Sequence, residues 1–338
     1  MVRFGISLRS ILKATDTVVK KLYSNDGSIN LIKPYGNSFI ESRYVKRADN
    51  RISLYLSSHN GCKMNCKFCW LTQQKQTEFK HLSNQDYESQ VDLLLTEIAS
   101  IPQKLPKDHI RININMMARG EPLANKNIIN HYSDFYFKMV GQVTSRGYQT
   151  VKINLSTIMP HTVKHRSLES IFKFVPVSLY YSMYSLNPEF RKEWIPNGID
   201  PRLALDKIKE YQMQCIDNHV SFPVTFHWTF IEGQNDNQND VENLIKEIKS
   251  RDLIDAKFNL VRYNPHPNQN YQESPNYQEL FDMVNSEIDS KETKSDNKIP
   301  KLGECSNRTP SRIVERVGYD SYVRCGMFPQ DQKINHVM

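Results

Sequence analysis

Three cysteines fall within eight residues of the chain, in the segment Cys62-Lys-Met-Asn-Cys66-Lys-Phe-Cys69. Thiolates with this C-x3-C-x2-C spacing on one loop can bind three irons of a [4Fe–4S] cluster and leave the fourth iron open to a ligand. A zinc site with a remote fourth ligand such as His59, or three unrelated buried cysteines, would also account for the pattern. The spacing favours the iron–sulfur cluster, because a closed zinc site needs four ligands.

A second segment, Gly120-Glu121-Pro122, has residue types that suit a charged small ligand. Glycine allows the backbone to approach a ligand closely, and glutamate supplies a carboxylate for an ammonium group. A simple loop turn is the alternative interpretation of this tripeptide. Its place one strand after the cysteines favours a ligand-binding role.

From residue 51 onward, strand-like and helix-like patterns alternate along the chain. Elements in this order would position the cysteine segment and the Gly120-Glu121-Pro122 segment in loops that follow strands. The expected strands are 51–57, 111–117, 150–156, 177–183, 222–231, 257–263 and 312–317, with helices between them. About six β/α units in series indicate an α/β fold, a partial (βα)6 barrel with a parallel sheet. Ligand chemistry in such sheets occurs at the carboxyl ends of the strands, where both segments lie.

The N-terminal part has a different pattern. Apolar residues at helical spacing predict a short helix over 8–22, and the runs 29–33 and 39–46 predict a β-hairpin. We therefore expect the following division: an N-terminal helix and hairpin extension (1–50), a barrel domain (51–327) containing a flexible polar insertion (290–310), and a C-terminal tail (328–338).

Composition sets broad limits on the function. The chain has 338 residues, 39% hydrophobic and 24% charged, which is typical of a globular protein. It contains no apolar run of the roughly 20 residues that a membrane span needs, and no signal peptide. We expect a cytoplasmic protein without a membrane partner. The formal net charge of +7 permits a polyanionic partner such as RNA but does not require one.

Longer segments narrow the function. The stretches SLYLSSHNGCKMNCKFCWLTQQ, INMMARGEPLAN, INLSTIMP, SMYSLNPEFRKEWIP, FIEGQND, FNLVRYNPHP and VRCGM occur in one order between about residues 26 and 327. Together they resemble the radical S-adenosylmethionine (SAM) superfamily, and within it the adenine methyltransferases of ribosomal and transfer RNA. The resemblance implies methylation at C2 or C8 of adenine. It also implies a [4Fe–4S] cluster on Cys62, Cys66 and Cys69 whose open iron binds SAM, and an electron donor such as flavodoxin.

The resemblance also implies a set of SAM contacts. Gly120 and Glu121 would hold the methionine part of SAM, and Ser156 and Asn264 would contact SAM from later strands. Ser182 would also bind SAM, with Met183 and Tyr184 standing where the family usually has Leu-His. Taken singly, each serine or asparagine is better explained as a local turn or cap.

The resemblance assigns a methyl-carrying role to Cys325, in Arg324-Cys325-Gly326-Met327. In the family, one SAM methylates this thiolate, and a second SAM yields the radical that abstracts hydrogen from the S-methyl group. The methylene radical then adds to adenine. A thiolate suits this role because it is strongly nucleophilic. A buried C-terminal cysteine is the alternative.

The chain departs from the family at residue 55. The family has a second cysteine seven residues before the first cluster cysteine, and here that position is Tyr55, which acts as an acid or base but forms no disulfide. Cys305 could substitute for the missing thiol, or Tyr55 could serve another release step or another reaction, or turnover could be lost. Packing on the strand is the alternative for Tyr55. Glu41 resembles the glutamate that acts as proton acceptor in the family, although its distance in sequence from residue 55 differs from the family's by one residue.

Three functions remain open from the sequence. The first is an RNA adenine C-methyltransferase, the second a radical SAM enzyme of another reaction class, and the third a non-catalytic iron–sulfur or zinc protein. We expect the family's N-terminal RNA-binding domain to be mostly absent, because about 25 residues precede the hairpin. Basic residues that could grip phosphates, or simply form a solvated surface, are Lys63, Lys67, Lys75, Lys80, Arg119, Arg262 and Arg324.

Overall fold

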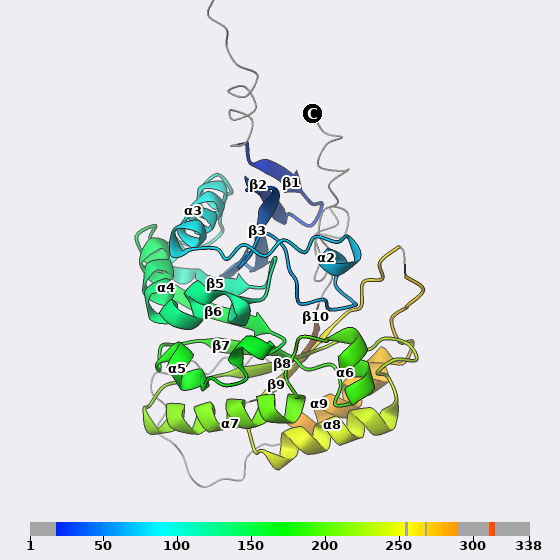
Figure 1. Cartoon of the computed structure of the whole chain (residues 1–338). Helices are drawn as coiled ribbons and strands as arrows, with labels where there is room; N and C mark the ends of the chain where they lie inside the picture. The colour runs from blue at the N-terminus through cyan, green and yellow to red at the C-terminus, as the bar shows by residue number, and fades with distance from the viewer. Residues whose placement is uncertain (1–17, 254–255, 268, 290–310, 315–338) are drawn as a thin grey trace, which may run out of the picture.

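The computed structural model describes residues 18–253, 256–267, 269–289 and 311–314 (Figure 1). A ten-stranded sheet runs through these residues, with its strands side by side in chain order. The strands are β1 (Lys20–Tyr23), β2 (Ile29–Tyr35), β3 (Ser38–Ala48), β4 (Arg51–Leu56), β5 (Arg111–Met116), β6 (Thr150–Thr157), β7 (Ser178–Ser182), β8 (Val224–Trp228), β9 (Lys257–Val261) and β10 (Arg312–Val314).

Strands β4 to β10 pair in parallel, and a helix follows each strand of the series before the next begins. The connecting helices are α3 (Asn84–Ala99), α4 (Lys126–Thr144), α5 (Leu168–Phe172), α7 (Pro201–Asp217), α8 (Gln238–Ser250) and α9 (Tyr277–Asp289). Two further helices, α2 (Trp70–Gln73) and α6 (Pro188–Trp194), lie in the loops after β4 and β7. The expected α/β partial barrel of six β/α units is therefore confirmed.

The helices begin where the sequence predicts. Ser83 and Asp86 form a reciprocal capping box at the start of α3, which satisfies backbone donors that the helix leaves unpaired. Asp200 caps α7 by accepting from the amides of Arg202 and Leu203, and Pro201 occupies the first helical position. These local signals fix where each strand gives way to its helix, and so fix the loops that carry the site.

Strands β1 to β4 form an antiparallel meander that extends the parallel sheet. The predicted hairpin is confirmed as β2 and β3. The predicted helix over 8–22 is wrong in its described part, because Lys20–Tyr23 forms β1 and pairs with residues 29–32 of β2. The backbone pairing with β2 stabilises this segment as a strand, although its apolar residues have helical spacing. The predicted insertion, 290–310, lies outside the described residues.

The two faces of the sheet differ sharply in chemistry. On β4, the side chains of Ile52, Leu54 and Leu56 are fully buried in the large apolar core shared with the helices. The alternating residues Arg51 and Tyr55 are only half buried and belong to the opposite face. In Figure 1 the helices α3, α4, α7 and α8 accordingly lie along the outside of the sheet. No helix of the described residues has the length and apolar composition to cross a membrane.

Candidate active site

The cysteine loop follows β4 and is tied to two other segments. The amide of Cys62 donates to the carbonyl of Gln76 at 3.0 Å, which closes the loop on itself, and the amide of Cys69 donates to the carbonyl of Cys66 at 3.0 Å. A Cβ at Gly61 would come within 2.4 Å of the carbonyl oxygen of Glu78, so only glycine fits before the first cysteine. Sequence and packing thus fix the backbone that carries the thiols.

The three thiols lie close enough to influence one another. Burial raises the pKa of Cys62 and Cys66, and the neighbouring cysteines raise both pKa values further. Thiolates crowded in this way need a bound cation to be stable. Among the described residues, no three His, Cys, Asp or Glu side chains converge on the position of a single metal ion. A cubane cluster needs no such convergence, because each thiolate binds a different iron.

His59, the proposed fourth ligand of a zinc site, has other partners. One ring nitrogen, Nδ1, lies 3.0 Å from the hydroxyl of Ser58, and the other, Nε2, lies 3.1 Å from Nδ1 of His81. The ring also stacks on Phe79 with centroids 3.9 Å apart. Burial lowers the pKa of His59 to about 3, so the imidazole is neutral. The arrangement makes His59 a packing residue and leaves neither nitrogen to complete a zinc site.

The loop after β5 places Glu121 beside the cysteine loop. Gly120 has φ +95°, and a Cβ there would lie 2.5 Å from both Ser58 and His59, so the position requires glycine. One carboxylate oxygen of Glu121 accepts from the amide of Leu123 and the other from the amide of Ile158, both at 3.0 Å. The two backbone donors could not be recognised from the sequence, because main-chain amides do not depend on residue type, and the sequence analysis did not identify them.

Glu121 is buried and, among the described residues, forms no ion pair with a basic side chain. Burial raises its pKa to about 7, although the hydrogen bonds from Ile158, Thr157 and Leu123 favour the charged form. A buried carboxylate without a basic partner costs free energy, which a cationic ligand would recover. The sequence prediction of a ligand-binding glutamate thus gains a physical basis.

The other predicted SAM contacts are spread along the same edge of the sheet. Ser156 and Ser182 lie at the carboxyl ends of β6 and β7, and Asn264 follows β9. The carbonyl of Asn264 accepts from the indole nitrogen of Trp70 at 3.3 Å, which links this loop to the helix after the cysteines. Neighbouring strands of a parallel sheet end at the same edge, so these residues face the region of the cysteine loop.

Tyr184 and Met183, which follow Ser182, have different surroundings. The ring of Tyr184 stacks on Phe68, the residue before Cys69, with centroids 4.6 Å apart. Met183 is fully buried, and its carbonyl accepts from the guanidinium of Arg191 at 2.8 Å. Tyr184 therefore borders the cysteine loop, whereas Met183 is engaged within the protein. The contact of Met183 with SAM stays a prediction.

Two further candidates lie on the strands that precede the cysteine loop. Tyr55, in the middle of β4, accepts a hydrogen bond from Arg47 at 2.7 Å. Glu41, on β3, is buried and pairs with the buried Arg119 at 2.9 Å. Burial raises the pKa of Glu41, while the charge of Arg119 and its hydrogen bond lower it. Catalytic roles for Tyr55 and Glu41 stay predictions.

The structure corrects part of the predicted phosphate-binding set. Arg119 is 1% exposed, and it also donates to the carbonyl of Asn60 at 3.1 Å, so no phosphate can reach it. Lys67 donates to Tyr271 at 2.6 Å and pairs with Glu193, and Arg262 pairs with Glu273. These side chains hold loops together. Two predicted positions, Cys325 and Cys305, lie outside the described residues, as does Arg324.

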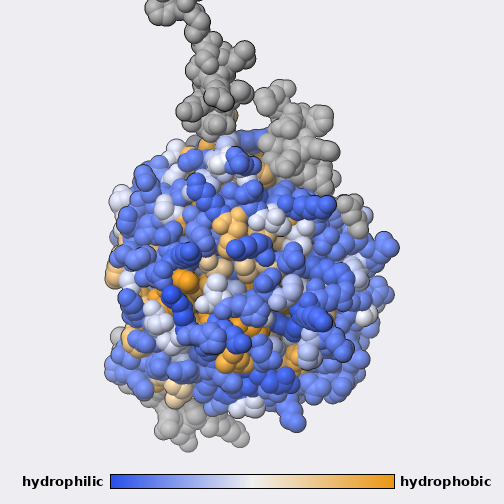
Figure 2. Space-filling view, in the orientation of Figure 1, coloured by the Kyte–Doolittle hydropathy of each residue, from blue (hydrophilic) through white to orange (hydrophobic). Residues whose placement is uncertain are grey.

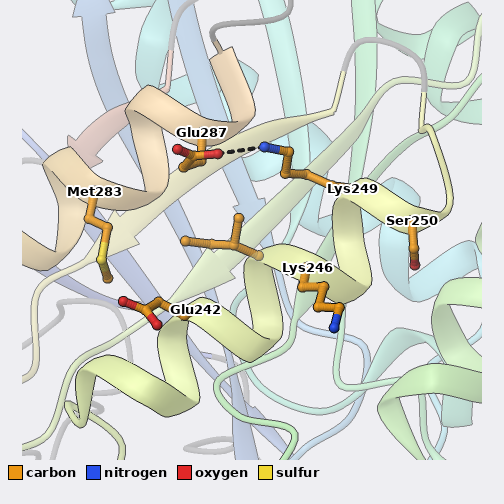
Figure 3. A pocket seen from close by; sticks show the side chains of 7 residues that line it. Glu242, Lys246, Lys249, Ser250, Met283 and Glu287 are labelled. Atoms are coloured by element: carbon orange, nitrogen blue, oxygen red, sulfur yellow. Dashed lines mark hydrogen bonds and ion pairs between the residues drawn. The ribbon is translucent and has the colours of Figure 1, made fainter.

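A surface hollow between α8 and α9 is unrelated to this site (Figure 3). Figure 3 shows its side chains on the outer helices, with Lys249 and Glu287 joined as an ion pair. The residues that line it are Glu242, Ile245, Lys246, Lys249, Ser250, Met283 and Glu287. None of the predicted site residues is among them, and the candidate active site therefore remains at the carboxyl edge of the sheet.

Sequence comparison places these residues in context. The chain is 28% identical over 281 residues to the dual-specificity RNA methyltransferase RlmN of Francisella tularensis subsp. mediasiatica, covering 82% of this chain and 72% of that protein. It is 29% identical, with the same coverage, to RlmN of F. tularensis subsp. tularensis. The chain is thus similar in sequence to the RlmN methyltransferases over most of its length. No family model matches it.

The structural comparison concerns the fold. A radical SAM methyltransferase from Sphaerobacter thermophilus superposes with a TM-score of 0.66 at 18% identity, over 96% of this chain and 85% of that chain. The two proteins share a fold.

The surface in Figure 2 is mainly hydrophilic, with apolar residues gathered toward the middle of this face. The predicted resemblance to RNA methyltransferases and the expected barrel are both confirmed.

Proposed function

We propose that this chain is a radical SAM enzyme that methylates adenine in RNA. The single observation that carries the proposal is that three features lie together at one edge of the sheet: the cysteine loop, Gly120 in its left-handed conformation and the buried carboxylate of Glu121, which forms no ion pair within the described residues. The relationship to RlmN, whose name describes action on RNA, supports the class of substrate.

The residues present fit both cofactors. Cys62, Cys66 and Cys69 would hold a [4Fe–4S] cluster, whose fourth iron is then open to a ligand. Glu121 would bind the ammonium group of SAM, because it is the buried carboxylate that lacks a cation. When bound and reduced, the cluster supplies the electron that cleaves SAM. A small electron donor such as flavodoxin would deliver that electron in the cytoplasm, where we place the enzyme.

The chain's own residues bind and orient the reactants. A side chain at Gly120 would collide with Ser58 and His59, so glycine is needed for the loop that carries Glu121 to pack beside the segment that leads into the cysteine loop. The amides of Leu123 and Ile158 hold the Glu121 carboxylate in one orientation. Ser156 and Asn264 would donate hydrogen bonds to SAM from neighbouring loops. This arrangement pre-organises one binding geometry, which catalysis requires.

Cys325 would carry the methyl group in this scheme. Its thiolate would attack the methyl carbon of SAM, so that a carbon–sulfur bond forms at Cys325, the sulfur–methyl bond of SAM breaks and S-adenosylhomocysteine leaves. At residue 55 the chain has a phenol hydrogen-bonded to Arg47, where the family has a second cysteine. Release of the methylated base therefore uses groups other than a thiol at this position.

Mass spectrometry of Cys325 tests the proposal. The protein is purified anaerobically with its cluster and supplied with methyl-labelled SAM, and the peptide containing Cys325 is analysed. We expect one labelled methyl group on Cys325 and none on the buried Cys215, which serves as an internal control. Reductive cleavage of SAM to 5′-deoxyadenosine with unmodified Cys325 would overturn the methyl transfer and indicate another radical reaction.

A further inference from the structure

The face of the sheet that turns away from the helices is polar on β4 and β5. Its residues alternate with the core residues on each strand, and the pairing register aligns them across strands: Arg51 with Arg111, Ser53 with Asn113, and Tyr55 with Asn115. The interior of a packed barrel is instead filled with bulky apolar side chains. A polar face of this kind is suited to binding a ligand rather than to stabilising the fold.

Positive charge gathers at the amino end of this face. Arg51 and Arg111 are direct neighbours on adjacent parallel strands. Burial lowers the pKa of Arg51. The positive charges of Arg312, on the opposite side of the sheet, and of Arg47 lower this pKa further. Strand β10 is six strands away from β4, so the sheet must curve until its two sides face each other.

In the described part of the chain, these cations have no negatively charged partners. Within the described residues, Arg47, Arg51, Arg111 and Arg312 form no ion pair, and the strands contain a single acidic residue, Glu41, which is paired with Arg119. The Nε atoms of Arg51 and Arg111 are buried and, in this part of the chain, have no hydrogen-bond partner. Like charges placed side by side destabilise a sheet, so the cluster is expected to serve a ligand.

We infer that Arg51 and Arg111, with Arg47 and Arg312, bind a phosphate group of the RNA substrate at the amino end of the polar face. Guanidinium groups bind phosphate through paired hydrogen bonds, and Asn113 and Tyr180 lie nearby to contact sugar or base. The inference rests on the proposed function for the identity of the polyanion. It names residues that sequence reasoning did not single out.

The position of the cluster distinguishes this phosphate from the anionic part of SAM. Arg51 is the first residue of β4, and the cysteine loop follows the last, Leu56. Six residues of strand span about 17 Å, so the arginines lie a strand length from the SAM edge. The carboxylate of SAM therefore cannot be their ligand, whereas an RNA chain that places one base at the carboxyl edge can reach them with a phosphate a few nucleotides further along the chain.

Salt-dependent RNA binding tests the inference. The full chain, purified anaerobically, is titrated into fluorescein-labelled bulk transfer RNA, and anisotropy gives the dissociation constant at several salt concentrations. We expect the double variant Arg51→Gln/Arg111→Gln to bind at least roughly tenfold more weakly at low salt. The slope of log affinity against log salt should fall by roughly 0.7 to 0.9 for each phosphate that the variant no longer neutralises.

Two matched variants control the experiment. Arg146→Gln removes a positive charge that pairs with Asp92 on the outer, helical side, and it should leave both affinity and slope unchanged. Arg51→Lys keeps the charge but loses the planar fork, so its affinity should fall less than that of the double variant. Because the two arginines repel each other, the melting temperature of the double variant should not fall.

The possible results separate this inference from the proposed function. If wild type binds RNA and the double variant binds it with the same affinity and slope, the phosphate site is overturned while RNA methylation stands. If wild type binds no RNA, both are overturned. If adenosine 5′-monophosphate binds wild type and not the double variant, while RNA binding is unchanged, the arginines serve a free nucleotide and the inference fails.

Discussion

Replacing Arg119 with methionine should destabilise the protein strongly, because it leaves the buried carboxylate of Glu41 without its positively charged partner. The two side chains are 0% and 5% exposed, and their ion pair joins β3 to the loop that carries Glu121. Breaking a buried pair by removing one partner costs about 3–5 kcal/mol, since the remaining charge is buried alone. For a domain of this size, we expect the melting temperature of Arg119→Met to fall by roughly 10 °C.

The pH dependence gives the prediction its sharpest form. Burial already raises the pKa of Glu41 above its ordinary value, and loss of the Arg119 charge would raise it further. A carboxyl whose pKa is higher in the folded than in the unfolded state loses stability as the pH rises, because the unfolded state then releases its proton more readily. Arg119→Met should therefore be least destabilised at low pH and most destabilised at high pH.

The double variant Glu41→Met/Arg119→Met is the matched control. It replaces the pair by apolar side chains of similar volume, an exchange that is often nearly neutral. We expect it to be clearly more stable than Arg119→Met alone, and its difference from wild type to change little with pH. Thermal unfolding of the three proteins at several pH values measures this. Equal destabilisation of the single and double variants would refute a buried ion pair at this position.

Three more predictions concern the site itself. Gly120→Ala should weaken SAM binding measured by calorimetry, because the new Cβ would lie 2.5 Å from Ser58 and His59 and would displace the loop that carries Glu121; binding with unchanged affinity would contradict the need for glycine at this position. The affinity for SAM should weaken roughly tenfold when the pH is lowered from 8 to 6, because Glu121, with its pKa of about 7, is mostly protonated at pH 6. Glu121→Gln should bind SAM weakly at every pH. A wild-type affinity that does not change with pH would argue against an ionised Glu121 as the ligand. Cys66→Ser should lose the iron and the visible absorption of the reconstituted protein while Cys215→Ser keeps both, and full iron content in Cys66→Ser would count against the cluster.

Much of the fold could be predicted because its signals are local. Strand alternation, the capping box at Ser83 and the Asp200-Pro201 start of α7 all depend on residues close together in sequence. The failure at Lys20–Tyr23 has the opposite cause, because β1 exists through pairing with β2. A helical pattern cannot report a partner strand further along the chain.

The site divides in the same way. The cysteines and Gly120-Glu121 are recognisable from spacing and residue type, and the structure brings them together at one edge of the sheet. The burial of Arg119 was not predictable, because its partner Glu41 is 78 residues away. The arginine cluster was also hidden, since Arg51 and Arg312 meet only when the sheet curves. Charge in a sequence does not reveal which face of a sheet it occupies.

The most direct test of the proposed function is the fate of the methyl group in RNA. The cluster-loaded protein is incubated anaerobically with a reductant, deuterated-methyl SAM and bulk RNA, and the digested nucleosides are analysed by mass spectrometry. Methyladenosine carrying deuterium, formed together with 5′-deoxyadenosine and lost in Cys325→Ser, is the predicted result. Formation of 5′-deoxyadenosine without any labelled methyladenosine would contradict the assignment of this chain as an RNA adenine methyltransferase.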